Sequence, residues 1–320
     1  MPVRLDDYHL AFIRSSKKAL SLFEASRLSG LPYHFVRDIY ATLHPILAAR
    51  FQVEYTSFRL LPVALIGEED CPSWLAKTLT AKLEGNVESR LCLGLAPIPR
   101  VLEVYEGLDV IRGLELYYWD CDYYPSSEPR QPQEKDYTVP KLERKLYVRP
   151  DPIDMAILSF RISDPFMRST DSYENALKVD PSLPRVSDYT VDYHFRRHLR
   201  PLWRGNQVYL IQPLTEAPVQ VYLLEGWRSP TLARTASTLT GYWFSLLDEK
   251  RAIVFAQFHE REKISFYRAL RALQVKNTYG ELLIPTEGVK FWRPLLWKNL
   301  KDKGWPQEFE AIESKRIVFP

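Results

Sequence analysis

Two stretches of the chain carry the same short pattern: CPSWLAKTLTAKLEG over residues 71–85 and RSPTLARTASTLTG over residues 228–241. In each, a proline is followed by Leu-Ala, a basic residue and threonine, which predicts a helix that begins at the proline. Each stretch follows one apolar run, LLPVALIG or VQVYLLEG, and precedes another, RLCLGLAP or RAIVFAQF. This match predicts that one structural unit occurs twice in tandem.

Further elements keep the same order in both copies. A second amphipathic helix is expected over residues 99–111 and 263–275, and a last strand over 113–119 and 280–285. The offset between copies is 157 residues at the Leu-Ala pair and 161 at the arginine that precedes the next strand. The order strand, helix, strand, helix, strand predicts a ferredoxin-like unit with helices on one face of its sheet. Its other face needs a partner, so we expect the two sheets to face each other.

A helical head precedes each of these units. The first is SLFEASRLSGLPYHFVRDIYATLHPIL, residues 21–47, in which apolar residues at helical spacing flank Gly30 and Pro32. Glycine suits the turn between two helices and proline suits the start of the second. This is the pattern of a helix-turn-helix. The alternating segment RFQVEYTSFRLLP, residues 50–62, predicts a two-stranded wing.

The second head begins near residue 150. A first helix is expected in DPIDMAILSF and a second over residues 169–179, and a third begins in SDYTVDYHFRRHLRPLW, residues 187–203. Ser187 is a good N-cap, and Val191, Phe195 and Leu199 or Leu202 form an inward stripe. The strand QVYLIQP, from residue 207, is the expected wing. The offset from the first head is 155 to 156 residues, so the repeat includes the heads.

The third helix of the second head points to nucleic acid. From residue 185 to residue 204 the chain has five arginines against two aspartates. Arginine grips phosphate with a fork of donors or reads guanine edges, although most charge runs are only solvated surface. We expect double-stranded DNA to contact Tyr189, Thr190, Tyr193, Arg196, Arg197, Arg200 and Arg204 in the second head, and Tyr33, His34, Arg37, Arg50 and Arg59 in the first. Arg50 and Arg59 have the alternative role of keeping an edge strand soluble.

These residues resemble the feast/famine (Lrp/AsnC) family of transcriptional regulators. DPIDMAIL, residues 151–158, resembles the opening helix of that family, and TVDYHFRR, residues 190–197, resembles its recognition helix. The resemblance implies a winged helix-turn-helix followed by a βαββαβ (RAM-like) domain, in a DNA-binding transcriptional regulator. The family has one unit per chain, so two fused units imply an internal pseudo-dimer. The glycine turn of the family's effector domain is missing, with GYWF at 241–244 as the nearest stretch, so a small-molecule effector at the ferredoxin-like domains stays open.

The expected fold is therefore α+β, with two winged helix-turn-helix domains alternating with two ferredoxin-like βαββαβ domains. The predicted boundaries are winged helix 1 at 1–59, ferredoxin-like domain 1 at 60–118, a linker at 119–147, winged helix 2 at 148–214, ferredoxin-like domain 2 at 215–285 and a C-terminal extension at 286–320. In the extension, Trp292, Leu295, Leu296 and Leu300 are at helical spacing, and that helix packs either on the body or on another chain. The aromatic run at 117–119 stacks on bases or, more commonly for such runs, forms strand core.

An enzyme is the less favoured prediction. The chain has no P-loop, GxGxxG, HExxH or GxSxG motif, so no catalytic residue and no cofactor is assigned. Sirohaem decarboxylases are similar to the Lrp/AsnC family and also pair two such units, but their His-Asn-Tyr signature has no match at 86–90 or 240–244. A third alternative is an architectural protein that binds DNA without reading its sequence. His194 and His198 have a spacing that suits a metal, but no third ligand is evident and no metal is expected.

Composition sets the remaining expectations. The 320 residues carry a net charge of only +3, so any basic surface must be local. Cys71, Cys92 and Cys121 are far apart with no CxxC pair, which favours unpaired thiols in a reducing interior. Neither a signal peptide nor an apolar run long enough to span a membrane is evident, so a cytoplasmic protein without membrane contact is expected. Homodimerisation stays open.

Overall fold

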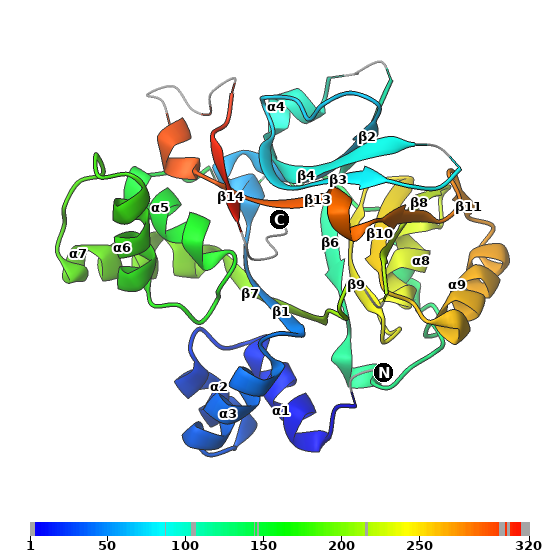
Figure 1. The fold of residues 1–320 in the computed structure, drawn as a ribbon, viewed down its shortest axis with the longest axis horizontal. Helices are drawn as coiled ribbons and strands as arrows, with labels where there is room; N and C mark the ends of the chain where they lie inside the picture. Colours follow the sequence, from blue (N-terminus) through cyan, green and yellow to red (C-terminus); the bar gives the residue numbers. More distant parts are fainter. Residues whose placement is uncertain are drawn as a thin grey trace.

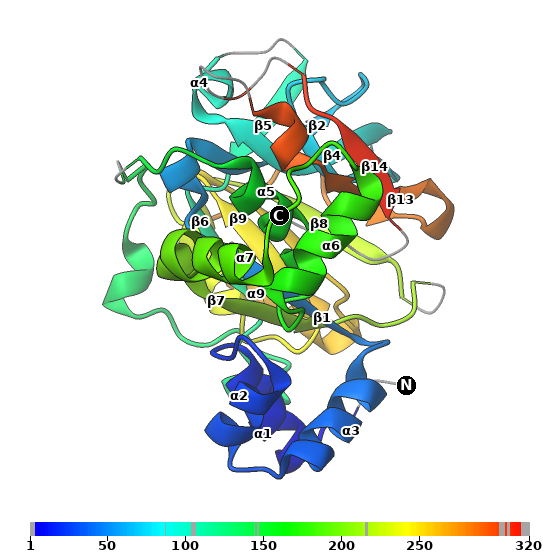
Figure 2. The same ribbon diagram turned by 90° about the vertical axis from the view of Figure 1, so that its left-hand side faces the viewer.

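The computed structural model describes residues 4–86, 88–103, 107–143, 145, 147–214, 217–300, 305 and 308–314. Two helical heads lie at separate corners of the molecule (Figures 1 and 2). A two-stranded β-sheet follows them, and two six-stranded β-sheets form the body. The first head consists of α1 (Asp7–Ser16), α2 (Leu22–Ser29) and α3 (Tyr33–Leu43). The second consists of α5 (Pro152–Arg161), α6 (Ser169–Val179) and α7 (Asp188–His194).

Local signals in the sequence set the ends of these helices. Gly30 ends α2 with a φ of 72°, in the left-handed region where a side chain would be strained. Ser187 caps α7, because its hydroxyl accepts a hydrogen bond from the Thr190 amide at 3.3 Å. Val191, Phe195 and Leu199 are buried, which confirms the predicted inward stripe.

The predicted two-stranded wing of the first head is wrong. Residues 47–53 form β1 (Leu47–Val53), a 3-10 turn follows at Tyr55–Phe58, and β2 (Leu60–Gly67) belongs to another sheet. β1 instead pairs antiparallel with β7 (Trp203–Leu210), the strand that follows the second head. Leu47 lies opposite Leu210 and Arg50 opposite Gln207, so each head's strand has the other head's strand as its partner.

The second copy forms the five elements that were predicted for it from its residues. These are β8 (Val219–Glu225), α8 (Ser229–Ala236), β10 (Arg251–Ala256), α9 (Glu260–Ala272) and β12 (Leu282–Ile284). Two further strands are present, β9 (Tyr242–Leu247) and β11 (Lys276–Asn277). The sheet has the order β11-β8-β10-β9-β6, and β12 also pairs with β8. The last member, β6 (Glu115–Tyr118), comes from the first copy and pairs with β9.

The first copy departs from the prediction at both helices. Residues 76–83, expected in a helix, form β3 (Ala76–Leu83), because Ala76, Leu79, Ala81 and Leu83 turn inward while Lys82 is exposed. The second expected helix is only the four residues of α4 (Ile98–Val101), and part of its range forms β5 (Leu108–Arg112); residues 104–106 lie outside the described chain. With β4 (Ser89–Pro97), the sheet has the order β14-β13-β3-β4-β2-β5.

The C-terminal extension contains strands rather than the predicted helix. β13 (Val289–Pro294) pairs with β3, and β14 (Ala311–Ser314) pairs with β13. Between them lies a 3-10 turn at Leu296–Asn299. Leu295, Leu296 and Trp297 are buried in one cluster with α5, so this segment packs on the body of its own chain.

The two sheets pack on each other through one apolar core. Alternate residues such as Ala64 and Ile66 of β2 join this core together with Val221 and Leu223 of β8. The residues between them, including Val63 and Leu65, face the other way and pack under Trp74 and Leu75 of the loop before β3. This arrangement agrees with the expectation that the sheets face each other within one chain.

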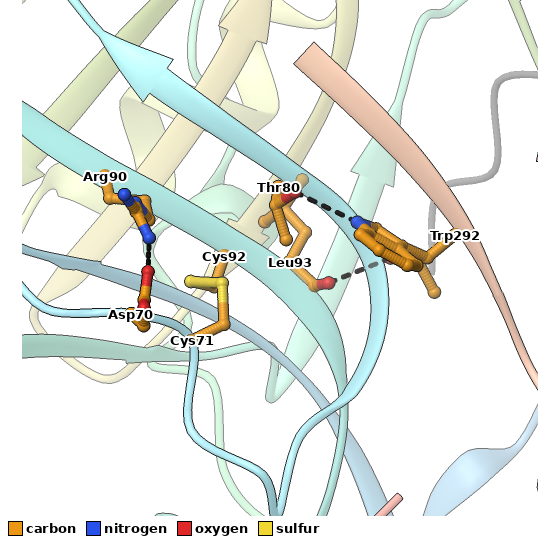
Figure 3. The surroundings of a disulfide bond; sticks show 8 residues. Asp70, Cys71, Thr80, Arg90, Cys92, Leu93 and Trp292 are labelled. Atoms are coloured by element: carbon orange, nitrogen blue, oxygen red, sulfur yellow. Dashed lines mark hydrogen bonds and ion pairs between the residues drawn. A yellow bond between two sulfur atoms is a disulfide. The ribbon is translucent and has the colours of Figure 1, made fainter. Parts of the chain in front are cut away.

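A disulfide joins Cys71, in the loop before β3, to Cys92 of β4, with Cα atoms 5.7 Å apart (Figure 3). The prediction of unpaired cysteines is therefore wrong, and the inference from them to a reducing compartment loses its basis. The ion pair Asp70–Arg90 lies beside the disulfide. Cys121 is buried and free. In the described chain, no helix combines the length and apolar character that crossing a bilayer requires.

In the segment between the copies, residues 128–138 pack on α8 and on the turn after it. We call these residues the strap. Arg234 of α8 donates to the main-chain carbonyls of Asp136 at 2.6 Å and Thr138 at 2.7 Å. Within the strap, the Arg130 guanidinium donates to both carboxylate oxygens of Asp136, at 2.5 and 2.7 Å. The side chain of Asp136 is fully buried, so this pair fixes the strap from inside.

We predict that Asp136→Asn lowers the free energy of unfolding by about 3 kcal/mol, because it leaves a buried guanidinium without its counter-charge. Urea unfolding of both proteins measures this. The matched control is Asp122→Asn, which breaks an exposed pair with Arg14 and should cost less than about 1 kcal/mol. Equal losses of unfolding free energy in the two variants would show that the Arg130–Asp136 pair does not stabilise the fold more than an exposed pair does.

The same pair gives a pH dependence. The Arg130 hydrogen bonds hold the pKa of Asp136 below its ordinary value. The stabilisation is therefore complete above the ordinary aspartate pKa and is lost as the pH falls through the lowered one. The difference in stability between the wild type and Asp136→Asn should shrink on acidification within that range.

Candidate functional site

The candidate site lies on the second head, and buried Arg161 of α5 holds that head together. Its guanidinium donates to three main-chain carbonyls: Met167 at 2.6 Å, Pro165 at 2.9 Å and Leu20 of the first head at 2.9 Å. It also lies over the ring of Phe195, 4.3 Å from its centre. Burial lowers the pKa of this guanidinium to about 10. Arg161 thus joins α5, the end of α7 and the first head.

The predicted DNA contacts of the second head lie on α7, on the two turns after it and at the start of β7. After α7 the chain continues in a π-helical turn, Phe195–Leu199, and a 3-10 turn, Arg200–Leu202. Tyr189 is 82% exposed and Tyr193 49%. The predicted arginines along this run are all exposed, at positions 196, 197, 200 and 204. Thr190 is half-buried and its hydroxyl is 3.0 Å from that of Ser187.

Few carboxylates oppose these arginines. Arg196 lies 3.4 Å from Asp192 and Arg204 lies 3.4 Å from Glu54, and both pairs are partly exposed. Asp192 also accepts a hydrogen bond from the Ser169 hydroxyl at 2.6 Å. Within the described chain, Arg197 and Arg200 have no acidic partner within ion-pair distance. The surface of this run, which we call the arginine face (Arg185, Arg196, Arg197, Arg200 and Arg204), therefore keeps positive charge free for a ligand.

The first head presents less free positive charge than the second head. Tyr33, His34 and Arg37 are exposed on α3, but Arg37 lies 3.6 Å from Asp38. Arg50, expected on a wing, is only 3% exposed, because the pairing of β1 with β7 places it inside the molecule. The prediction that Arg50 lies on the surface and contacts DNA is therefore wrong. Arg59 is exposed and lies over the ring of Tyr147, 4.3 Å from its centre.

Two histidines on the same run of chain as these arginines meet a buried aspartate. The Nδ1 atom of His194 is 2.9 Å from the Asp154 carboxylate, and that of His198 is also 2.9 Å from it. Burial raises the pKa of Asp154, against the hydrogen bonds from the two histidines. Sequence reasoning named the histidines but missed Asp154, which precedes them by 40 residues or more and meets them only through packing of α5 on α7.

A cavity of about 510 Å³ lies between the head strands and β6. Its charged lining residues are Lys17, Glu54, Glu115, Asp120 and Arg204. Tyr117, Tyr118 and Trp119 form part of its wall, so this aromatic run belongs to the body rather than to an exposed stacking surface.

Comparisons with known proteins find only distant likeness. No family model matches the chain, and no curated protein does. A crystal structure of the siroheme decarboxylase NirDL aligns with 8% identity and a TM-score of 0.44, covering 87% of this chain and 91% of that one. The same enzyme in co-complex with an iron-uroporphyrin III analogue aligns with 10% identity and a TM-score of 0.41 over the same shares. These neighbours are enzymes of the kind named among the alternatives drawn from the sequence, and at this distance they decide no activity.

We predict that Arg161→Met lowers the free energy of unfolding by about 3 kcal/mol or more, since three carbonyls lose a charged donor. Exposed Arg168 gives the matched control, and Arg168→Met should change stability by about 0.5 kcal/mol or less. Thermal and urea unfolding measure both. A small effect of Arg161→Met would show that the second head does not depend on this side chain.

Proposed function

We propose that this chain binds double-stranded DNA through the arginine face of its second head. The supporting observation is the run of exposed arginines and tyrosines along α7 and the two turns after it. Guanidinium groups form paired hydrogen bonds with phosphate and with the edge of guanine. In this proposal α7 enters the major groove, with Arg196, Arg197 and Arg200 on bases or phosphates and with Tyr189 and Tyr193 beside them.

The charge balance of the whole chain supports a local site rather than a general one. Net charge is +3 over 320 residues, yet the stretch 185–204 alone has five arginines against two aspartates. Affinity for DNA comes largely from phosphate neutralisation, so a local excess of this kind is the feature to expect. Base contacts add sequence preference.

The proposal assigns the two heads unequal roles. Arg37 of the first head is next to Asp38, and Arg50 is buried, so the first head presents little free positive charge. We assign it a supporting role, since the pairing of β1 with β7 fixes the second head to it. Action as a transcriptional regulator of the Lrp/AsnC type, with the two tandem copies acting as an internal pseudo-dimer, is the finer form of this proposal. If the chain binds DNA without sequence preference, the proposal becomes one of an architectural DNA-binding protein.

We predict that Arg196→Ala/Arg197→Ala weakens binding to a labelled duplex by roughly tenfold or more, because each lost contact is worth about 1 kcal/mol or more. Fluorescence anisotropy at low salt measures the dissociation constants. Both side chains are exposed, so the fold should not change.

The matched control is Arg268→Ala/Arg271→Ala on α9, which removes the same charge from two exposed positions. α9 lies on the opposite side of the molecule from α7 in Figure 1. The proposal requires the control to bind like the wild type. Equal losses in the two double variants, or no binding of the wild type at low salt, would refute it.

Small-molecule chemistry is the second candidate function, and the cavity beside β6 favours it. Its charged lining has the cations Lys17 and Arg204 against the carboxylates Glu54, Glu115 and Asp120. Such a lining has an excess of negative charge, so it disfavours a polycarboxylate and suits a neutral or cationic ligand. The substrate class of the neighbouring decarboxylases therefore does not match the charge of this cavity.

We predict that iron-uroporphyrin III does not bind with micromolar affinity. A titration followed through the porphyrin absorption band tests this. Tight one-to-one binding that weakens in Lys17→Ala would reverse the order of the two candidates and favour an enzyme of the decarboxylase kind. The matched control is Lys18→Ala, at the neighbouring position outside the cavity lining.

A further inference from the structure

The cluster of two histidines and a buried aspartate has the composition of a metal site. Asp154 lies on α5, His194 ends α7, and His198 lies in the π-helical turn that follows. One ligand atom from each residue lies within 4.8 Å of those of the other two. The carboxylate is fully buried and the two rings are partly exposed, with His198 the more open. An ion can therefore enter from the solvent side and meet the buried carboxylate.

The distances are close to those of a coordination shell. The Asp154 carboxylate is 2.9 Å from His194 Nδ1 and 2.9 to 3.1 Å from His198 Nδ1. Ligands about 2.0 to 2.1 Å from a tetrahedral zinc ion are separated by roughly 3.3 Å. A shift of a few tenths of an ångström would therefore open the cluster for an ion. The carboxylate of Asp151 is farther away, 3.7 Å from His194 Nδ1, and accepts the hydrogen bond of the Ile153 amide at the start of α5.

The backbone departs from a regular α-helix at this point. The π-helical turn spans Phe195–Leu199 and contains His198. Such turns are rare and occur frequently at functional sites. Here the turn begins directly after His194 and keeps both Nδ1 atoms directed at Asp154, while Phe195 and Leu199 remain in the core.

We propose that Asp154, His194 and His198 bind a divalent transition-metal ion, with zinc as the best match. Two imidazoles and one carboxylate are ligands that zinc prefers, and Mg²⁺ and Ca²⁺ prefer oxygen. Water completes the shell. A ring nitrogen that binds the ion carries no proton, so a proton on Nδ1 moves to Nε2 or is released when the ion binds.

This site is independent of the proposed DNA binding, although it lies next to it. The ion ties the end of α7 to α5, the helix that carries Arg161. His194 and His198 alternate along the chain with Arg196, Arg197 and Arg200. Metal binding therefore stabilises the turn on which the arginine face is built, and its presence is measurable without any nucleic acid.

The test uses the full chain without a histidine tag, freed of metal with a chelator and then dialysed. Zinc ion is titrated against a colorimetric zinc chelator, and cobalt(II) absorption reports the ligand geometry. We expect one zinc ion per chain and a rise in Tm on adding zinc. His198→Gln should bind zinc roughly tenfold more weakly or worse.

His44→Gln is the matched control, because His44 is an exposed histidine at the end of α3 in the first head. It should bind zinc like the wild type. Because Asp154 is buried and its loss can prevent folding, the decisive variants are His198→Gln and His194→Gln/His198→Gln, with circular dichroism as the check of folding. The proposal fails if the folded double variant binds zinc as tightly as the wild type.

Discussion

The antiparallel pairing of β1 with β7 is the constraint on which the arrangement of the heads depends. Each strand follows one head and also contributes residues to the cluster of the other head. Phe51 of β1 lies in the cluster built around α5 to α7, with its ring 6.3 Å from that of Trp203. Val208 and Leu210 of β7 lie in the cluster that contains α1 and α3. The strand pair therefore joins the two clusters, and each head packs against residues of both strands.

Polar contacts secure this arrangement. The Asn206 side chain of β7 donates to the carbonyls of Ser16 at 2.9 Å and Ala19 at 2.6 Å, both in the first head. In the reverse direction, the Phe51 amide of β1 donates to the Ile162 carbonyl at 3.2 Å, and Arg161 donates to Leu20. These groups are buried, and an unmade bond at any of them would be costly. The position of the arginine face thus follows from contacts made far from it.

Much of this architecture could be predicted from sequence, but not what depends on contacts between distant residues. Gly30, Ser187 and the stripe of Val191, Phe195 and Leu199 indicate their helices through local physics. Residues 71–85 were expected to match 228–241, yet Ala76–Leu83 alternates like a strand, and its neighbours in space decide its state. The buried position of Arg50, the Cys71–Cys92 disulfide and the approach of Asp154 to two histidines all arise from pairing or packing that no local pattern encodes.

The salt dependence of DNA binding tests the central claim most directly. When the logarithm of the association constant is plotted against the logarithm of salt concentration, the slope counts the phosphates that the protein neutralises. The account predicts a steep negative slope for the wild type. It predicts a slope shallower by about 2 in a variant that lacks Arg196 and Arg197, if both contact phosphate. A slope near zero in the wild type, or an unchanged slope in the variant together with unchanged affinity, would contradict it.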